Sequence, residues 1–134
     1  MVLLSPWLMA GLLVTEIKDV VLDELMLRKG AKRLACNIEK ARGETRGEGQ
    51  VAHHIVSRND RRAEGARQIL KRVGMDLDDP NNGVVLDASR HSGLHTNLYY
   101  LTVEGRLKLA RTYEDAVSIL AGIRGQIVAV TFPY

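Results

Sequence analysis

All four histidines of this 134-residue chain lie in two short groups, His53-His54 and His91 to His95. His91 and His95 are four residues apart, so a helix would place both imidazoles on one face, near enough to share one ion. His53 and His54 are adjacent, and in a strand their side chains would point to opposite faces. One of that pair can then ligate a metal while the other faces a substrate or water. The structural alternative is that His91 and His95 are surface residues on neighbouring turns, and that His53 and His54 are half-buried and hydrogen-bonded to the backbone.

Composition restricts which class of protein can use these histidines. The length predicts one domain, and 46% hydrophobic and 26% charged residues exclude a fully disordered chain. The single cysteine, Cys36, excludes both a disulfide framework and a cysteine-rich zinc ribbon. Any metal must therefore be held by histidine and carboxylate side chains.

The positive charge is concentrated in one part of the chain. The net charge is only +3, but 13 basic and five acidic residues lie between Arg28 and Arg72, which leaves a negative balance elsewhere. Such asymmetry favours a surface that faces a polyanion, most commonly nucleic acid. A solvated, arginine-rich helix face is the alternative.

The first residues form an apolar stretch, Val2–Val14, which is too short to span a bilayer. It also lacks the positive residues that begin a secretory signal. Helical spacing of apolar residues predicts a helix over Ser5–Asp23, and Leu25–Ala41 either extends it or forms a second helix. This helix is expected to pack on the domain or on a neighbour, and a membrane-active segment is the alternative. The glycine-rich stretch Ala41–Gln50 predicts a loop.

Short strands and helices follow this loop. Strands are predicted at Gly49–Val56 and Gly83–Leu86, separated by a basic helix at Asp60–Val73 that Asn59 or Asp60 caps and Gly74 ends.

The second half of the chain is predicted to be mostly helical. A helix is expected from Ser89 or His91 to Leu101, and another from Thr112 to Ile123 that ends at Gly125, with a strand in the tail Gln126–Phe132. The predicted fold class is α+β, mainly helical, with a small two-stranded strand–strand–helix centre. We expect a helical extension at residues 1–48 and a core at residues 49–134.

Four blocks of this sequence resemble one nuclease family. They are Val51–Val56, Gly74–Asp78, Asn82–Leu86 and His91–Tyr100, within about Gly49–Arg124. Together they resemble the AHH nucleases of the HNH/endonuclease VII superfamily, the ββα-metal or His-Me finger enzymes, which are common as toxin domains of bacterial polymorphic secreted proteins. One departure from the colicin-type members is the longer insert of 27 residues, Ile55–Asn81.

The resemblance implies a role for each matching residue. His53, His91 and His95 would be the metal ligands, and His54 would be the general base. Asn82 would brace the loop and hold a backbone carbonyl that orients the base. Three imidazoles favour Zn²⁺ or another first-row ion such as Ni²⁺ over Mg²⁺, although superfamily members are often active with Mg²⁺ or Mn²⁺.

The resemblance implies a divalent-metal-dependent endonuclease that cleaves double-stranded DNA with little sequence preference. A zinc-stabilised nucleic-acid-binding module that does not cut, and a ribonuclease on the same fold, are the alternatives. The non-cutting module would use His54 as a fourth metal ligand or not at all.

Arginines near the histidines are candidate contacts to nucleic acid. Arg58, Arg61 and Arg62 follow the first pair, with Arg58 and Arg62 one helical turn apart, and Arg90 precedes His91. Of these residues, Arg90 has the better claim to touch the scissile phosphate, because it lies beside His91. A solvated surface charge is the alternative for each.

Other polar residues are given structural interpretations. Asp76, Asp78 and Asp79 are interpreted as turn and cap residues rather than an acidic metal cluster. Tyr99 and Tyr100 are interpreted as core or half-buried contacts, with substrate stacking as the alternative.

The resemblance also implies a biological setting. It implies a secreted effector delivered into the cytoplasm of a target cell and a cognate immunity protein as partner. The short apolar stretch predicts no stable membrane span, and its position directly after Met1 is what a C-terminal fragment of a larger effector would show.

Overall fold

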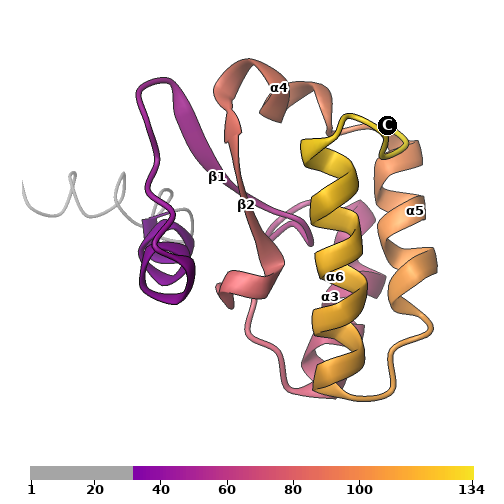
Figure 1. The fold of residues 1–134 in the computed structure, drawn as a ribbon. Helices are drawn as coiled ribbons and strands as arrows, with labels where there is room; N and C mark the ends of the chain where they lie inside the picture. Colours follow the sequence, from indigo (N-terminus) through magenta and orange to yellow (C-terminus); the bar gives the residue numbers. More distant parts are fainter. Residues whose placement is uncertain (1–31) are drawn as a thin grey trace, which may run out of the picture. The chain divides into compact units, whose positions relative to one another are not determined.

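The computed structural model describes residues 32–134, which belong to one compact unit, Ala31–Tyr134 (Figure 1). The predicted helix at Ser5–Asp23 and the apolar stretch Val2–Val14 lie outside the described residues. The described part begins with a helix at residues 32–42, which overlaps the predicted 25–41 stretch and extends one residue beyond it. No helix of this described part has the length and apolar character needed to cross a bilayer.

Two short antiparallel strands form the centre of the unit. β1 (Gln50–His54) pairs with β2 (Gly83–Asp87), in a register that sets His53 opposite Val84 and His54 opposite Gly83. Both strands lie where the alternating apolar residues predict them. The α4 helix (Ala88–Gly93) follows β2 directly, so the strand–strand–helix centre is confirmed.

The two faces of this sheet are covered by different parts of the chain. Ala52 packs with Leu34 and Ile38 of the helix at residues 32–42. Val84 and Leu86 face the other way, into the main core. Because side chains alternate along a strand, His53 shares the core face with Val84, and His54 shares the face of the 32–42 helix.

The main core lies between three longer helices, α3 (Glu64–Val73), α5 (Asn97–Leu107) and α6 (Tyr113–Val128). Figure 1 shows α5 and α6 side by side. A short 3₁₀ turn, η1 (Arg61–Ala63), precedes α3, and its N-cap Asp60 accepts a hydrogen bond from the Arg62 backbone N–H. Gly74 ends α3 in the left-handed conformation that glycine adopts at least cost. The predicted basic helix, its cap at Asp60 and its end at Gly74 are thus confirmed.

The helix predicted to run up to Leu101 is wrong, because the structure has two helices there. α4 ends at Gly93, and α5 begins at Asn97 with Thr96 as its N-cap, whose hydroxyl accepts from the Tyr99 backbone N–H at 3.2 Å. A side chain that satisfies the first free N–H groups defines a new helix start.

The predicted end of the last helix is also wrong. α6 begins after the N-cap Thr112, as predicted, but continues through Gly125 to Val128. Ile123 and Ile127 are both buried on this helix, and that burial outweighs the ~1 kcal/mol helix penalty of one glycine. The predicted tail strand is absent from the described chain, since α6 occupies its first residues and Phe132 packs against Tyr99.

The predicted α+β class is confirmed: the described chain is mainly helical around one small antiparallel sheet. A second 3₁₀ turn, η2 (Pro80–Asn82), leads into β2. The division at residues 48 and 49 stays a prediction, but the 32–42 helix packs directly on the sheet.

Candidate active site

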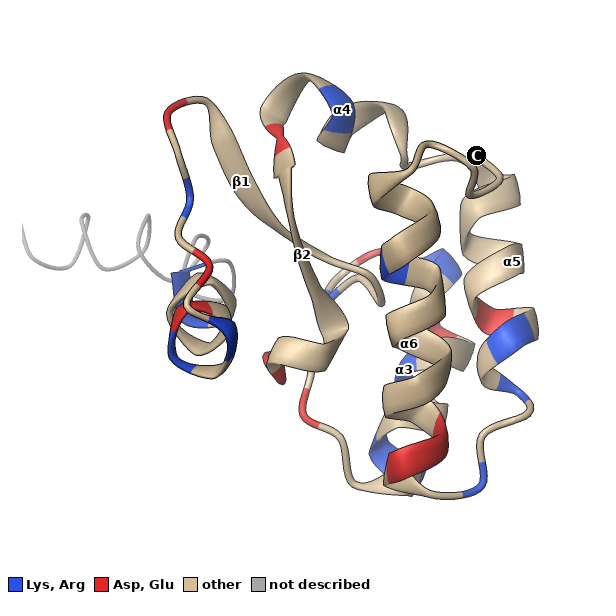
Figure 2. Cartoon of the chain, in the orientation of Figure 1, with Lys and Arg blue, Asp and Glu red and all other residues tan. Residues whose placement is uncertain are grey.

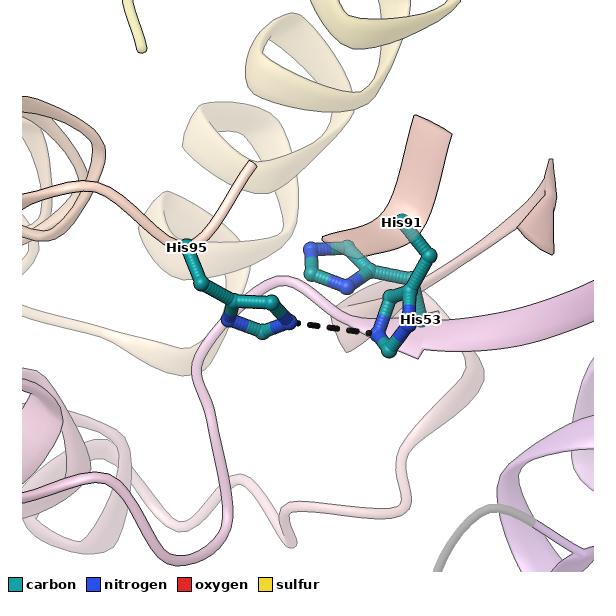
Figure 3. A group of neighbouring side chains, drawn as sticks. All are labelled: His53, His91 and His95. Atoms are coloured by element: carbon teal, nitrogen blue, oxygen red, sulfur yellow. Dashed lines mark hydrogen bonds between the residues drawn. The ribbon is translucent and has the colours of Figure 1, made fainter. Parts of the chain in front are cut away.

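Three imidazoles from separate parts of the chain meet in one cluster (Figure 3). His53 is in β1, His91 is in α4, and His95 lies between α4 and α5. One ring nitrogen from each residue lies within 4.8 Å of the others. His95 is thus reached by a bend in the chain and not by the continuous helix that the i, i+4 spacing indicated.

His53 is almost fully buried, at 1% exposed. Its Nε2 lies 2.8 Å from the Tyr99 hydroxyl, but its Nδ1 is buried with no hydrogen-bond partner in the described structure. Burial, and then the neighbouring His91 and His95, lower the pKa of His53 well below 6.5, so the ring is neutral. An unpaired buried nitrogen costs about 1–3 kcal/mol and is a ready metal ligand.

His91 and His95 complete the cluster from the more open side. Their Nε2 atoms are 3.4 Å apart, and burial lowers the pKa of both rings. Nδ1 of His95 is 2.7 Å from the Tyr100 hydroxyl. Three neutral imidazole nitrogens that face one another are a donor set suited to Zn²⁺ and other first-row divalent ions.

His54 points away from this cluster. Its Nε2 lies 2.9 Å from Oδ1 of Asp78, and its side chain is only 12% exposed. Burial lowers the pKa of His54, while the hydrogen bond to Asp78 opposes that shift. The metal-type cluster of the described chain does not include His54.

Asp78 is a site residue that the sequence analysis missed. Asp76 and Asp79 have the expected turn and cap roles, because they accept hydrogen bonds from the backbone N–H groups of Asp78 and Asn81. Asp78 instead buries its carboxylate against His54 and receives a hydrogen bond from Arg58 at 3.0 Å. The expected backbone carbonyl is thus replaced by a carboxylate as the partner of His54. Its separation of 24 residues from His54 left no local signal.

Asn82 is fully buried and joins the end of β1 to the turn before β2. Its Oδ1 accepts from the Val56 backbone N–H at 2.8 Å, and its Nδ2 donates to the carbonyl of Leu77 at 2.9 Å. Its own carbonyl accepts from the Ile55 backbone N–H. This geometry suits the bracing role, but Asn82 acts on the backbone that carries His54 and not on a partner of its imidazole.

The candidate nucleic-acid arginines occupy different environments. Arg61 is exposed, and Arg58 contacts Asp78. Arg62 donates to Asp60 and Asn97, and its guanidinium lies 4.3 Å from the centre of the Tyr100 ring. Arg58 precedes η1, so the expectation that it lies one helical turn from Arg62 is wrong.

Arg90 donates to the Ile127 carbonyl near the end of α6, at 2.6 Å. Further basic residues occur on the helix at residues 32–42 (Figure 2).

Comparison with known proteins gives one match. The family model AHH, described as a nuclease family of the HNH/ENDO VII superfamily with conserved AHH, matches residues 36–127, and these contain the run Ala52-His53-His54. No curated protein and no solved structure matches the chain. Since the match covers well over half of its length, the chain belongs to the AHH family of nucleases in the HNH/ENDO VII superfamily.

Proposed function

We propose that this chain is a divalent-metal-dependent endonuclease that hydrolyses DNA phosphodiester bonds with little sequence preference. One observation carries the proposal: three imidazoles converge, while the adjacent His54 turns to the other face of β1 and pairs with Asp78. A metal-binding group and a separate base on neighbouring residues are what phosphodiester hydrolysis needs.

The residues of the cluster fit a divalent cation. The orphaned, buried Nδ1 of His53 has no other partner in the described structure, and all three rings are neutral near pH 7. A cation held by His53, His91 and His95 would supply Lewis acidity, which neutralises phosphate charge and stabilises the departing oxygen. Three histidines leave at least one coordination position for a substrate oxygen.

His54 is the proposed general base. Its Nε2 carries the proton that it donates to the Asp78 carboxylate, so its Nδ1 keeps a lone pair. That nitrogen takes a proton from the attacking water as the new P–O bond forms and the bond to the 3′ oxygen breaks. Because its pKa is lowered, His54 is neutral and ready to accept the proton near pH 7.

The positive surface supports a nucleic-acid substrate. Arg58 places a half-exposed guanidinium beside the His54–Asp78 pair, and Arg62 lies next to the Tyr100–His95 side of the cluster. Both positions suit contacts to a phosphate backbone, which carry no base information. Arg61 is exposed beside Arg62 and can add to these contacts, and Arg90, next to His91 in the sequence, is a further candidate although it donates to the Ile127 carbonyl.

Delivery into a target cell as a secreted bacterial toxin, and protection of the producer by an immunity protein, are also part of the proposal. These two points rest on the resemblance of the motif blocks alone.

A cleavage assay tests the function. Supercoiled plasmid and total RNA are incubated with the protein, with added divalent metal or with EDTA. We expect nicking and loss of the plasmid with metal, no loss with EDTA, and a rate about 10²–10⁴ lower for His54→Ala.

Two controls sharpen the assay. His54→Ala should keep bound zinc, because His54 lies outside the cluster, whereas His53→Ala should lose it. Intact plasmid and degraded RNA would favour a ribonuclease. Both substrates intact with zinc still bound would favour a module that binds nucleic acid without cutting it.

A further inference from the structure

Two consecutive tyrosines reach two different imidazoles of the cluster. Tyr99 and Tyr100 lie in the first turn of α5, and both are buried, at 1% and 4% exposed. The Tyr99 hydroxyl is 2.8 Å from Nε2 of His53, and the Tyr100 hydroxyl is 2.7 Å from Nδ1 of His95. Neighbouring helix positions differ by about 100° in direction, which lets one turn serve two ligands.

The hydrogen bonds of Tyr99 determine the proton position on His53. The Tyr99 hydroxyl donates its single proton to the Ile55 carbonyl, at 2.8 Å. Towards His53 it can only accept, so the proton of the neutral ring lies on Nε2. The lone pair is then on Nδ1, which is the buried nitrogen without a partner.

Tyr100 contacts the other kind of ring nitrogen, Nδ1, on His95. Nε2 of His95 faces His91 within the cluster, and Nδ1 is the nitrogen that contacts Tyr100. A metal ion in the cluster needs the lone pair of His95 on Nε2, so the proton of the neutral ring must lie on Nδ1. The Tyr100 oxygen is in position to accept that proton in a hydrogen bond.

We infer that Tyr99 and Tyr100 are positioning residues that hold His53 and His95 in opposite tautomers, so that Nδ1 of His53 and Nε2 of His95 are the metal-binding atoms. This inference rests on the metal site of the proposed function. Ligating histidines usually donate their second N–H to a carbonyl, carboxylate or water, which fixes the ring and raises its basicity. At His53 a tyrosine hydroxyl stands between the imidazole and the final acceptor, the Ile55 carbonyl.

Zinc affinity gives the first test. Tyr99→Phe and Tyr100→Phe keep the buried rings and remove only the hydroxyls. We expect each variant to bind Zn²⁺ about 10–100-fold more weakly than the unmodified chain, measured by competition with a chromophoric chelator. Tyr113→Phe is the matched control, because its hydroxyl bonds to Asp79 outside the cluster, and its zinc affinity should not change. Wild-type affinity in both test variants would overturn the inference.

The tautomers give a second test, which does not depend on any variant folding. Long-range ¹H–¹⁵N spectra of the metal-free chain near pH 7.5, above the ordinary histidine pKa, should show His53 protonated on Nε2 and His95 protonated on Nδ1. Tyr99→Phe should shift His53 towards a mixture of tautomers. The reverse tautomers in the unmodified chain would overturn the inference even if the phenylalanine variants bind zinc weakly, because loss of packing alone would then explain the weakness.

These readouts separate the inference from the proposed function. A chain with the expected tautomers and hydroxyl-dependent zinc affinity that leaves plasmid and RNA intact would support the tyrosine role and overturn the nuclease proposal. A chain that cuts plasmid with metal, but whose Tyr99→Phe and Tyr100→Phe variants bind zinc as tightly as the unmodified chain, would support the nuclease proposal and overturn the tyrosine role.

Discussion

At the scale of single residues, the Asp78 carboxylate has an unusual environment. It is buried, yet its oxygens contact His54 at 2.9 Å, Arg58 at 3.0 Å and Arg33 at 4.0 Å. Both guanidiniums are about half exposed, so they place positive charge beside the buried carboxylate without leaving water themselves. The hydrogen bond from Nε2 to Asp78 fixes the ring of His54 and leaves Nδ1 as the basic atom.

Replacing Asp78 should therefore damage catalysis without damaging metal binding. We expect Asp78→Asn to lower the rate of plasmid cleavage at least about tenfold, because the tautomer and orientation of His54 are no longer fixed. Zinc affinity should not change, since Asp78 lies outside the histidine cluster. Rates at saturating metal, together with chelator competition, measure the two effects.

Glu114→Gln is a suitable control, because Glu114 is exposed at the start of α6 and its loss removes the same charge. Equal rates for Asp78→Asn and the control would show that Asp78 does not orient the base.

The residues of the site differ in how far the sequence could predict them. The spacing of His91 and His95 predicted that they could share one ion, whereas the choice of His53 over His54 as the third ligand came from the resemblance to the AHH nucleases. Asp78 and Tyr99 could not be predicted, because their roles depend on contacts across 24 and 46 residues. Tyr100 is only five residues from His95, but their contact depends on the break between α4 and α5. An aspartate within a turn-rich stretch looks the same in sequence whether it caps a turn or binds a buried imidazole.

At the scale of elements, Gly83 permits the close approach of the 32–42 helix to β2. A Cβ atom at this position would lie 2.7 Å from side-chain carbons of Leu34 and Ile38, both of which are fully buried. We expect Gly83→Ala to lower the free energy of unfolding by about 1–3 kcal/mol, measured by urea denaturation, because these neighbours have little room to move.

Gly105→Ala is the matched control within α5. A Cβ atom there meets nothing within 4 Å, so the substitution should raise stability by about 0.5–1 kcal/mol. If both alanine variants change the free energy of unfolding in the same direction, close packing at Gly83 does not explain the effect of Gly83→Ala.

The end of α6 contains a backbone strain of a different kind. Val130 has φ of 60°, a left-handed conformation that a β-branched residue adopts only at a cost. Its side chain is 59% exposed, so little packing is lost on its removal. We expect Val130→Gly to stabilise the chain by about 1 kcal/mol in thermal unfolding, whereas Val128→Gly, inside the helix, should destabilise it. If Val130→Gly and Val128→Gly both lower the melting temperature, the backbone at Val130 is not strained.

The predicted elements were right where local chemistry decides them. The strands follow alternation, and Asp60 and Gly74 delimit the segment of α3 through their own side-chain and backbone chemistry. The break between α4 and α5, and the passage of α6 through Gly125, depend on a cap at Thr96 and on burial of Ile123 and Ile127. Burial in the core decides the second of these boundaries, whereas the first has a local signal, the N-cap Thr96, which the predicted helix overlooked.

At the scale of the whole molecule, the candidate site uses both faces of the small sheet. The core face presents His53 to the metal cluster, and the opposite face presents His54 to Asp78 and the 32–42 helix. In the proposed function, adjacent positions on one strand thus separate metal binding from proton transfer. The resemblance predicted this division of roles, but it did not include the helix that covers the second face.

The buried neutral histidines should make the stability of the metal-free chain depend on pH. Burial lowers the pKa of His53 well below 6.5, and the other three histidines are shifted in the same direction. Below pH 6.5 the unfolded chain binds protons that the folded chain does not, so the free energy of unfolding must fall as the pH falls. Above that pH both states are unprotonated at these groups, and the stabilisation is fully present.

We therefore expect the melting temperature in EDTA to be nearly constant between about pH 8 and 7 and to fall steadily from about pH 6.5 to 5. His53→Ala removes the most strongly shifted group, so its melting temperature should depend less steeply on pH over the same range. Added Zn²⁺ should raise the melting temperature most near neutral pH, because its ligands must be unprotonated. If the melting temperature of His53→Ala depends on pH as steeply as that of the unmodified chain, the lowered pKa of the buried His53 is not the cause of the pH dependence.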